Sequence, residues 1–156
     1  MTGAARAELA AVAGSRSGWP SRLRDLPAAA HSRAAAVLIL FGALDALPAG
    51  REAQDAAVSR DLDVLLLARA TTLRAHPGQV AFPGGRIDPG DDGPVAAALR
   101  EAREETGLDP AGVEVLGTLP EVPLEYSGHP DTPALGWWRR PAPARDADAA
   151  ESPAIF

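Results

Sequence analysis

Three glutamates, Glu101, Glu104 and Glu105, stand within five residues of one another in a stretch that favours a helix. Spacings of three and four residues place their carboxylates on one helix face within a single turn. Like charges repel at that spacing, so the pattern lowers the stability of the helix. A divalent cation such as Mg²⁺ removes the conflict, since it prefers carboxylate oxygens and keeps other coordination positions for water and phosphate. A solvated acidic stripe is the competing interpretation.

The neighbouring residues predict where this helix begins and ends. Pro94 suits the first helical position, and Gly107 suits the position just past the last turn. An apolar stripe between them is expected to pack in the core, and it consists of Val95, Leu99, Ala102 and Thr106. This stripe lies roughly 140° around the helix from the glutamates. One helix face is therefore expected to anchor the helix, which leaves the other face for chemistry.

Short apolar runs predict strands on both sides of the helix. The expected strands are 33–44 (around Val37 to Phe41), 62–68, 79–82 (ending in a turn at Pro83 to Gly85), 113–119 and 133–138. The segments 47–60, 86–93 and the tail from 141 are expected to be loops, and the start of the chain a short helix. Strands around one helix, with a glycine turn before it, predict an α/β layered domain.

Length and composition exclude several classes of protein. A chain of 156 residues suits one domain, and its net charge of −6 argues against nucleic acid or an anionic membrane as the main partner. Without cysteine, the chain has no disulfide, thiolate metal site or cysteine nucleophile, which fits a cytoplasmic location. No apolar run approaches the roughly 20 residues of a membrane span, and no signal peptide is expected.

The residues from Gly85 to Leu108 resemble the Nudix box, the motif of hydrolases that cleave a nucleoside diphosphate linked to another group. That motif is Gly, five residues, Glu, seven residues, then Arg-Glu-apolar-x-Glu-Glu-x-Gly-apolar, and residues 100–108 match its last part. Two positions depart from it. Asp92 stands where the first Glu belongs, and Arg86 stands where the Gly belongs, so that Gly85 comes one residue early.

Both departures, together with Phe82 to Gly85 and Asp88, are similar to the coenzyme A pyrophosphatase subgroup. An upstream motif at 65–85 extends the resemblance, which covers roughly residues 34–140. It implies the Nudix fold, an α/β/α layered sandwich with a mixed sheet. It also implies a domain at 34–156 after a helical leader at 1–33. The usual closing helix is expected to be absent from the short C-terminal part.

The resemblance implies an activity and a cofactor. The expected reaction is hydrolysis of the diphosphate linkage of coenzyme A or acyl-coenzyme A to 3′,5′-ADP and 4′-phosphopantetheine or its acyl form. Mg²⁺ or Mn²⁺ is the implied cofactor, with Glu101 and Glu105 as the first ligands and Glu104 as the next. Arg100 can reach Glu104 four residues on and hold its carboxylate in place. The general base stays open between a glutamate of this set and one on a later loop.

Five residues are expected to bind the substrate, and they are Arg69, Arg74, His76, Gly84 and Gly85. Arginine suits a phosphate because of its forked donors, and the resemblance favours Arg74 over Arg69. His76 is equally well explained as a residue that shapes a loop. The two glycines let the backbone approach a metal or a phosphate closely. Asp92 is expected to support the loop before the helix.

Two other functions remain open. The chain could be a Nudix hydrolase of ADP-ribose, a dinucleotide or a damaged nucleoside triphosphate, or a non-catalytic module that binds a nucleotide. In each case the partner is a small nucleotide. A homodimer is a further hypothesis, in which a second chain completes the short fold. The adjacent Trp137 and Trp138 are expected to pack inside the protein instead of stacking on a base.

Overall fold

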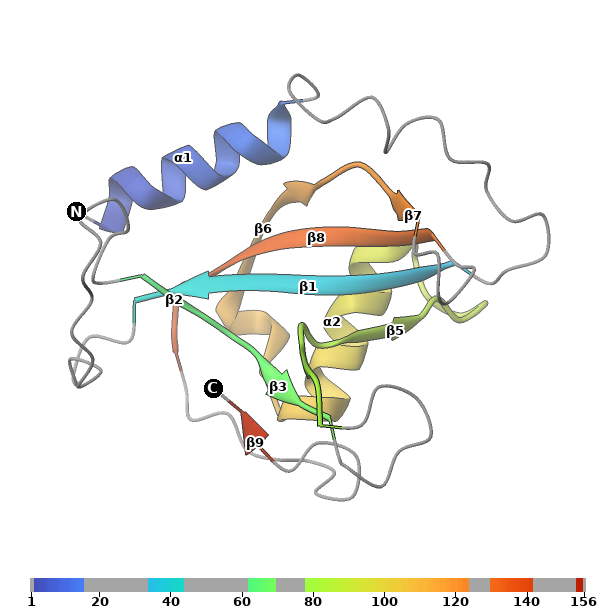
Figure 1. Ribbon diagram of the computed structural model, residues 1–156. Coiled ribbons are helices and arrows are strands. Elements are labelled where there is room, and N and C mark those ends of the chain that lie inside the picture. The colour runs from blue at the N-terminus through green and yellow to red at the C-terminus, as the bar shows by residue number, and fades with distance from the viewer. Residues whose placement is uncertain are drawn as a thin grey trace.

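The computed structural model describes residues 2–15, 34–43, 62–69, 78–123, 130–141 and 154–155 (Figure 1). Its helices are α1 (Thr2–Gly14), α2 (Pro94–Thr106) and a short 3₁₀ helix (Pro110–Gly112). The main sheet contains β1 (Ala35–Gly42), β2 (Asp63–Val64), β5 (Gly84–Arg86), β6 (Val113–Thr118), β7 (Val122–Pro123) and β8 (Pro130–Trp138). A second, small sheet contains β3 (Leu67–Ala68), β4 (Val80–Ala81) and β9 (Ala154–Ile155).

The main sheet is mixed and is centred on β1 and β8. These two strands run parallel, in a register that pairs Ala35 with Asp131 and continues to Phe41 with Trp137. β2 and β5 pair antiparallel with β1, whereas β6 and β7 pair antiparallel with β8. The strand order β2-β1-β8-β6 therefore places a late strand of the chain in the middle of the sheet.

One face of this sheet packs against α2. Alternate residues of β1 are fully buried there, together with small residues of the helix: Ala36, Leu38, Leu40, Ala97, Ala98 and Ala102. The predicted apolar stripe of the helix is confirmed, since Ala102 and Thr106 are buried and Val95 and Leu99 pack against the core. Ala97 and Ala98 are buried as well and extend that stripe. Their short side chains let the helix approach the sheet closely.

The opposite face of the sheet carries α1 over β6 and β8 (Figure 1). Arg6 of this helix forms an ion pair with Glu114 of β6, and a Cβ atom on Gly117 would lie 3.1 Å from the Cβ of Ala13. Two helices thus enclose a mixed sheet, which confirms the expected α/β/α sandwich. The second helical layer comes from the start of the chain.

Several predicted elements are confirmed. The helix begins at Pro94 and ends at Thr106, and the strands expected around Val37, at 113–119 and at 133–138 are β1, β6 and β8. Trp137 and Trp138 are both buried, as expected for packing residues. The predicted loop at 47–60 lies outside the described residues, as do residues 142–153 of the tail.

The single strand expected at 62–68 is wrong, because the backbone changes partners within it. β2 pairs with β1 in the main sheet, whereas β3 pairs with β4 and β9 in the small sheet. Leu65 and Leu67 are both buried, so the apolar run belongs to the core as expected. An apolar run predicts burial but carries no information about which strand the backbone will pair with.

Two segments expected to lack strand structure form strands. Gly84–Arg86, assigned to a turn and the start of a loop, is β5 and pairs with β1. Ala154–Ile155, assigned to the loop-like tail, is β9 and pairs with β3. Glycine is disfavoured in strands, but Gly84 lies so close to β1 that no side chain fits there.

Candidate active site

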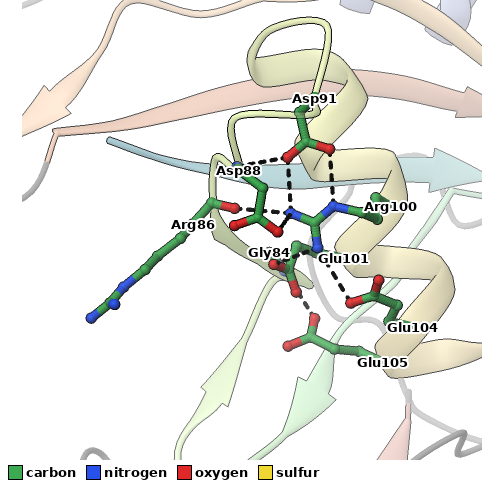
Figure 2. Close-up of polar contacts among 8 residues, drawn as sticks. All are labelled: Gly84, Arg86, Asp88, Asp91, Arg100, Glu101, Glu104 and Glu105. Atoms are coloured by element: carbon green, nitrogen blue, oxygen red, sulfur yellow. Dashed lines mark hydrogen bonds and ion pairs between the residues drawn. The ribbon is translucent and has the colours of Figure 1, made fainter. Parts of the chain in front are cut away.

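The helix α2 carries the three glutamates toward the glycine strand β5 (Figure 2). Pro94 occupies the first turn without an unmet backbone donor, and Gly107 ends the helix in the left-handed conformation at φ 68°. The backbone N–H of Gly84 donates to Oε2 of Glu105 at 2.9 Å. Glu101, one turn earlier, lies against the neighbouring Gly85. Two carboxylates of the helix thus contact adjacent residues of one strand.

These two glycines have no room for a side chain. A Cβ atom on Gly85 would lie 2.6 Å from the Cδ and Oε1 atoms of Glu101. On Gly84, a Cβ atom would lie 2.4 Å from the carbonyl oxygen of Ala36 and 2.7 Å from the Cα of Val37. Gly84 therefore lets β5 approach β1, whereas Gly85 lets the carboxylate of Glu101 reach the strand.

Arg100 lies at the centre of a cluster of carboxylates (Figure 2). Its Nε and Nη2 atoms donate to the two oxygens of Asp91, each at 2.9 Å. Its Nη1 atom donates to Glu101 at 3.0 Å and to Glu104 at 3.3 Å, so the expected contact with Glu104 is present. A carboxylate of Asp88 lies 3.4 Å from Nη2. Arg100 thus holds both glutamates in position.

The loop residue that accepts two hydrogen bonds from this arginine is Asp91, whereas the sequence pattern pointed to Asp92. The side chain of Asp91 is only 8% exposed and also accepts a hydrogen bond from the backbone N–H of Asp88. Asp92 is exposed. The spacing contained a signal for Asp91, because five residues separate it from Gly85, whereas seven residues separate Asp92 from Arg100. The loop is one residue longer than the motif, which leaves one of these two spacings unmatched.

The charges of the cluster are not balanced. One guanidinium faces four carboxylates, those of Asp88, Asp91, Glu101 and Glu104. The hydrogen bonds from Arg100 lower the pKa of Asp91. Burial raises the pKa of Glu101, and the charges of Glu104 and Asp88 act in the same direction, although Arg100 opposes them. Excess negative charge at a partly buried place attracts a cation.

The donor chemistry fits a hard divalent cation. Carboxylate oxygens are the ligands that Mg²⁺ and Mn²⁺ prefer, and Glu101, Glu104 and Glu105 offer them along one helix face. Within the described ranges, no three acidic or histidine side chains are arranged to hold a metal ion. Glu101 and Glu104 instead contact Arg100, and Glu105 contacts the backbone of Gly84. These carboxylates would have to turn from their present partners to share one ion.

A pocket of about 290 Å³ adjoins the glycine strand, and its lining includes Arg69, Phe82, Gly84, Gly85 and Asp131. The Nε atom of Arg69 is buried, and among the residues that the structure describes it has no hydrogen-bond partner. The backbone of Arg69 is fixed by two hydrogen bonds across the small sheet, one to the carbonyl of Gln79 at 2.8 Å and one from the N–H of Gly78 at 3.0 Å. A rigid backbone thus holds an arginine with an unused donor at a pocket.

The structure brings three of the five predicted substrate-binding residues to this pocket, namely Arg69, Gly84 and Gly85. Arg74 and His76 lie outside the described residues. Phe82 and Asp131 also line the pocket, and the sequence analysis assigned neither a role there. Phe82 stands directly before Pro83 and the glycine pair, which was the available signal. Asp131 reaches the pocket through strand pairing with β1, which no local pattern reveals.

No helix in the described part of the chain is long and apolar enough to cross a membrane.

Comparison with known proteins places residues 51–140 in a family described as the NUDIX domain. An uncharacterized Nudix hydrolase NudL from Cronobacter sakazakii is 52% identical over 73 residues, which make up 47% of this chain and 38% of that protein. NudL from Escherichia coli is 51% identical over a stretch with the same coverage. The similarity thus spans 38% of the length of each relative.

Solved structures show the same fold. The Nudix hydrolase RenU from M. smegmatis matches with a TM-score of 0.58 and 25% sequence identity, over 80% of this chain and 68% of that one. A binary complex of an Ap4A hydrolase from C. elegans matches with a TM-score of 0.54 and 21% identity, over 78% of this chain and 76% of that one.

Proposed function

Because the chain belongs to the Nudix family, we propose that it is a divalent-metal-dependent hydrolase of coenzyme A or acyl-coenzyme A. Hydrolysis of the diphosphate linkage yields 3′,5′-ADP and 4′-phosphopantetheine or its acyl form. Family membership supports the class of reaction. The choice of coenzyme A rests on the motif upstream of the glutamates and on the loop that carries Asp88, both of which resemble the coenzyme A pyrophosphatases.

One observation carries the proposal. The glycine strand β5 contacts the glutamates of α2 and also lines the pocket that contains Arg69. The glycine strand, which carries no bulky side chain at these positions, is therefore all that separates a diphosphate bound at the glutamates from a pocket with an arginine whose Nε donor has no partner among the described residues. Coenzyme A has this arrangement of charges, since it carries a diphosphate and a separate phosphate on its ribose.

The metal ligands that we propose are Glu101, Glu105 and Glu104. A bound Mg²⁺ or Mn²⁺ neutralises charge on the diphosphate and lowers the pKa of an attacking water. Arg100, fixed by Asp91, keeps Glu101 and Glu104 at the site and limits their mutual repulsion. Its role is to position these ligands.

The substrate-binding residues that we propose divide by chemistry. Arg69 offers a forked donor to a phosphate, and Arg74 is expected to do the same from the neighbouring segment. His76 is expected to shape that segment. Gly84 and Gly85 provide a backbone surface without side chains, along which a diphosphate can approach the glutamates.

The test is product analysis with coenzyme A and Mg²⁺, using the full chain and a Glu105→Gln variant. We expect the parent to release 3′,5′-ADP and the variant to lose roughly 100-fold or more of this activity. A Glu8→Gln variant, at an exposed position on α1, is the matched control and should behave as the parent.

Substrate comparison distinguishes the alternatives. We expect 3′-dephospho-coenzyme A to be a poorer substrate by about tenfold or more, because it lacks a charged partner for the arginines. Equal rates on both compounds would contradict the assignment to coenzyme A and favour another nucleoside diphosphate derivative. Binding without turnover in well-folded protein would favour a non-catalytic module.

A further inference from the structure

The pocket lies on the face of the sheet opposite α2. Ala35 and Val37 line it, whereas the alternate residues Ala36 and Leu38 pack under the helix. Asp131 is the register partner of Ala35 across the parallel pair of β1 and β8. Because residues paired in this way project to the same face, the side chain of Asp131 lies on the pocket side. Pairing of β1 with β8 thus brings a carboxylate to the pocket of Arg69.

Arg69 gives the pocket an anion-binding side. A buried donor without a partner is unfavourable, and no described residue supplies one to this Nε atom, so a ligand in the pocket is the partner that we expect. Arginine keeps its positive charge under all ordinary conditions, and its planar donors match the oxygens of a phosphate. The fixed backbone at β3 and β4 keeps this donor in place before a ligand arrives.

Asp131 gives the same pocket a side that favours hydrogen-bond donors over anions. An ionised carboxylate only accepts hydrogen bonds, so it repels a phosphate and binds a hydroxyl or an amino group. Asp131 already takes part in at least one interaction. A carboxylate has about four acceptor positions, which leaves capacity for a ligand donor.

The remaining lining limits the size of the ligand group. The walls are mostly small residues, and Phe82 is 37% exposed, which places an aromatic ring at the border with solvent. A volume of about 290 Å³ is at the lower end for ligand pockets, which suits one part of a nucleotide. A ribose with one phosphate fits these limits, and its base can lie outside against Phe82.

We propose that Asp131 is a specificity-determining residue that accepts a hydrogen bond from a ribose hydroxyl, while Arg69 binds a phosphate carried by the same ribose. This inference rests on the proposed function and extends it to one sugar of the substrate. The ribose of coenzyme A carries a 3′-phosphate beside a free 2′-hydroxyl. It therefore presents one acceptor group for Arg69 and one donor for Asp131.

The experiment compares the binding of 3′-AMP and 2′-deoxy-3′-AMP to the full chain, by NMR titration in the presence of EDTA. We expect the parent to bind 3′-AMP roughly tenfold more tightly, since only this nucleotide can donate to Asp131. In Asp131→Ala the two affinities should be nearly equal. In Arg69→Gln both nucleotides should bind more weakly, with the preference for 3′-AMP retained. Glu8→Gln on α1 serves as the control and should match the parent.

Equal affinities in the parent would overturn the inference, and so would a preference that survives in Asp131→Ala. If Asp131→Ala does not fold, Asp131→Asn replaces it. If Asp131→Asn keeps both the affinity for 3′-AMP and the preference for 3′-AMP over 2′-deoxy-3′-AMP, the charge of Asp131 has no role in binding the ribose. Inosine 3′-monophosphate tests the base, because it lacks the amino group of adenine. If the parent prefers 3′-AMP over this nucleotide but does not respond to the 2′-hydroxyl, the carboxylate contacts the base, which contradicts the proposal.

Hydrolysis of coenzyme A, measured separately with Mg²⁺, distinguishes this inference from the proposed function. Turnover in a parent that ignores the hydroxyl would leave the hydrolase standing and remove the role of Asp131. If the parent prefers the nucleotide with the 2′-hydroxyl but does not hydrolyse coenzyme A, the ribose site at Asp131 is supported and the proposed hydrolase activity is contradicted.

Discussion

Two arginines on opposite faces of the sheet illustrate two uses of ion pairs. Arg6 of α1 meets Glu114 of β6, with Nε at 3.0 Å from Oε2 and a second contact from Nη2. Here the negative charge of Glu114 faces positive charge alone, since Arg6 binds it and the charge of Arg139 also lowers its pKa, and the ion pair joins a helix to a strand. Arg100 also makes a forked contact, with Asp91, but further carboxylates surround it.

The difference lies in charge balance. The pair of Arg6 and Glu114 is complete, and it serves to attach α1 to the sheet. The cluster around Arg100 contains four carboxylates for one guanidinium, so its members repel one another in the folded state. Stability alone does not explain such an arrangement, whereas the cation binding that we propose does. Variants in or beside one of these two regions can be compared with variants in the other.

The largest effect is expected for Glu101→Gln. We expect activity to fall by about 10² to 10³, since a metal ligand is lost. Because burial raises the pKa of Glu101, its ionised form lowers stability at neutral pH, and the neutral variant should be at least as stable without metal. Activity assays and thermal unfolding in EDTA measure both. Glu114→Gln, from the pair with Arg6, is the control. If Glu101→Gln is as active as this control, the cluster around Arg100 has no special role in activity.

The two neighbouring glycines should respond differently to alanine. Gly85→Ala places a methyl group against the far end of Glu101, which can move, so activity should fall about 10- to 100-fold with a small change in stability. Gly84→Ala meets the backbone of β1, which cannot move, and should lower stability by about 1–3 kcal/mol. Urea unfolding and activity assays on both variants provide the test. A large stability loss in Gly85→Ala alone would reverse our assignment of the two positions.

Asp91 and Asp92 form a matched pair of adjacent carboxylates. Asp91→Asn removes the charge that fixes Arg100, so activity should fall by about tenfold through misplaced glutamates. Asp92→Asn should stay within about twofold of the parent, because its side chain is exposed and surface changes are usually small. Steady-state kinetics at several Mg²⁺ concentrations measure this. A larger effect in Asp92→Asn would support the assignment that the motif spacing first suggested.

Mg²⁺ should stabilise the unbalanced cluster and leave the balanced pair unaffected. At saturating Mg²⁺ we expect the Tm of the parent to rise by about 2–5 °C, through preferential binding to the folded state. The rise should disappear in Glu101→Gln and persist in Arg6→Ala. Differential scanning fluorimetry with and without EDTA is sufficient. An equal rise in all three proteins would show that Mg²⁺ binds elsewhere.

The smallest effect is expected for Glu114→Gln, which should keep full activity and lose a little stability. Arg6 lowers the pKa of Glu114, so the stabilisation is present above the unfolded pKa and is lost as pH falls through the lower folded pKa. The difference in Tm between parent and variant should therefore be larger at pH 7 than at pH 3. It should also shrink in 1 M salt, which screens exposed charges. A difference that does not depend on pH would mean that the pair contributes through packing alone.

Local signals in the sequence were sufficient for α2 and for the contact of Arg100 with Glu104. Pro94 and Gly107 act on their own backbone, and residues four apart on a helix meet whatever the rest of the chain does. The predicted core stripe was correct for the same reason. These features depend on residues close together in the chain.

Features that depend on strand pairing were missed. The break between β2 and β3, the strand at Gly84–Arg86 and the arrival of Asp131 at the pocket all result from contacts between distant segments. A pattern of apolar residues predicts which side chains are buried, but not the partner or the register of a strand. The roles that we propose for Glu101, Glu105 and Arg69 remain predictions, because they concern a metal and a substrate.

The position of β8 has a consequence for how the chain is made. β1 and β6 both lie beside β8, so during synthesis their pairing edges stay unsatisfied until residues beyond 130 have left the ribosome. Strand edges without partners promote association between chains, and contacts between distant segments form slowly. A nascent chain that stalls after α2 carries the complete set of glutamates on a sheet that lacks its central strand. Such a product is expected to be a target for chaperones or to aggregate, even though every residue of the hydrolase motif is present.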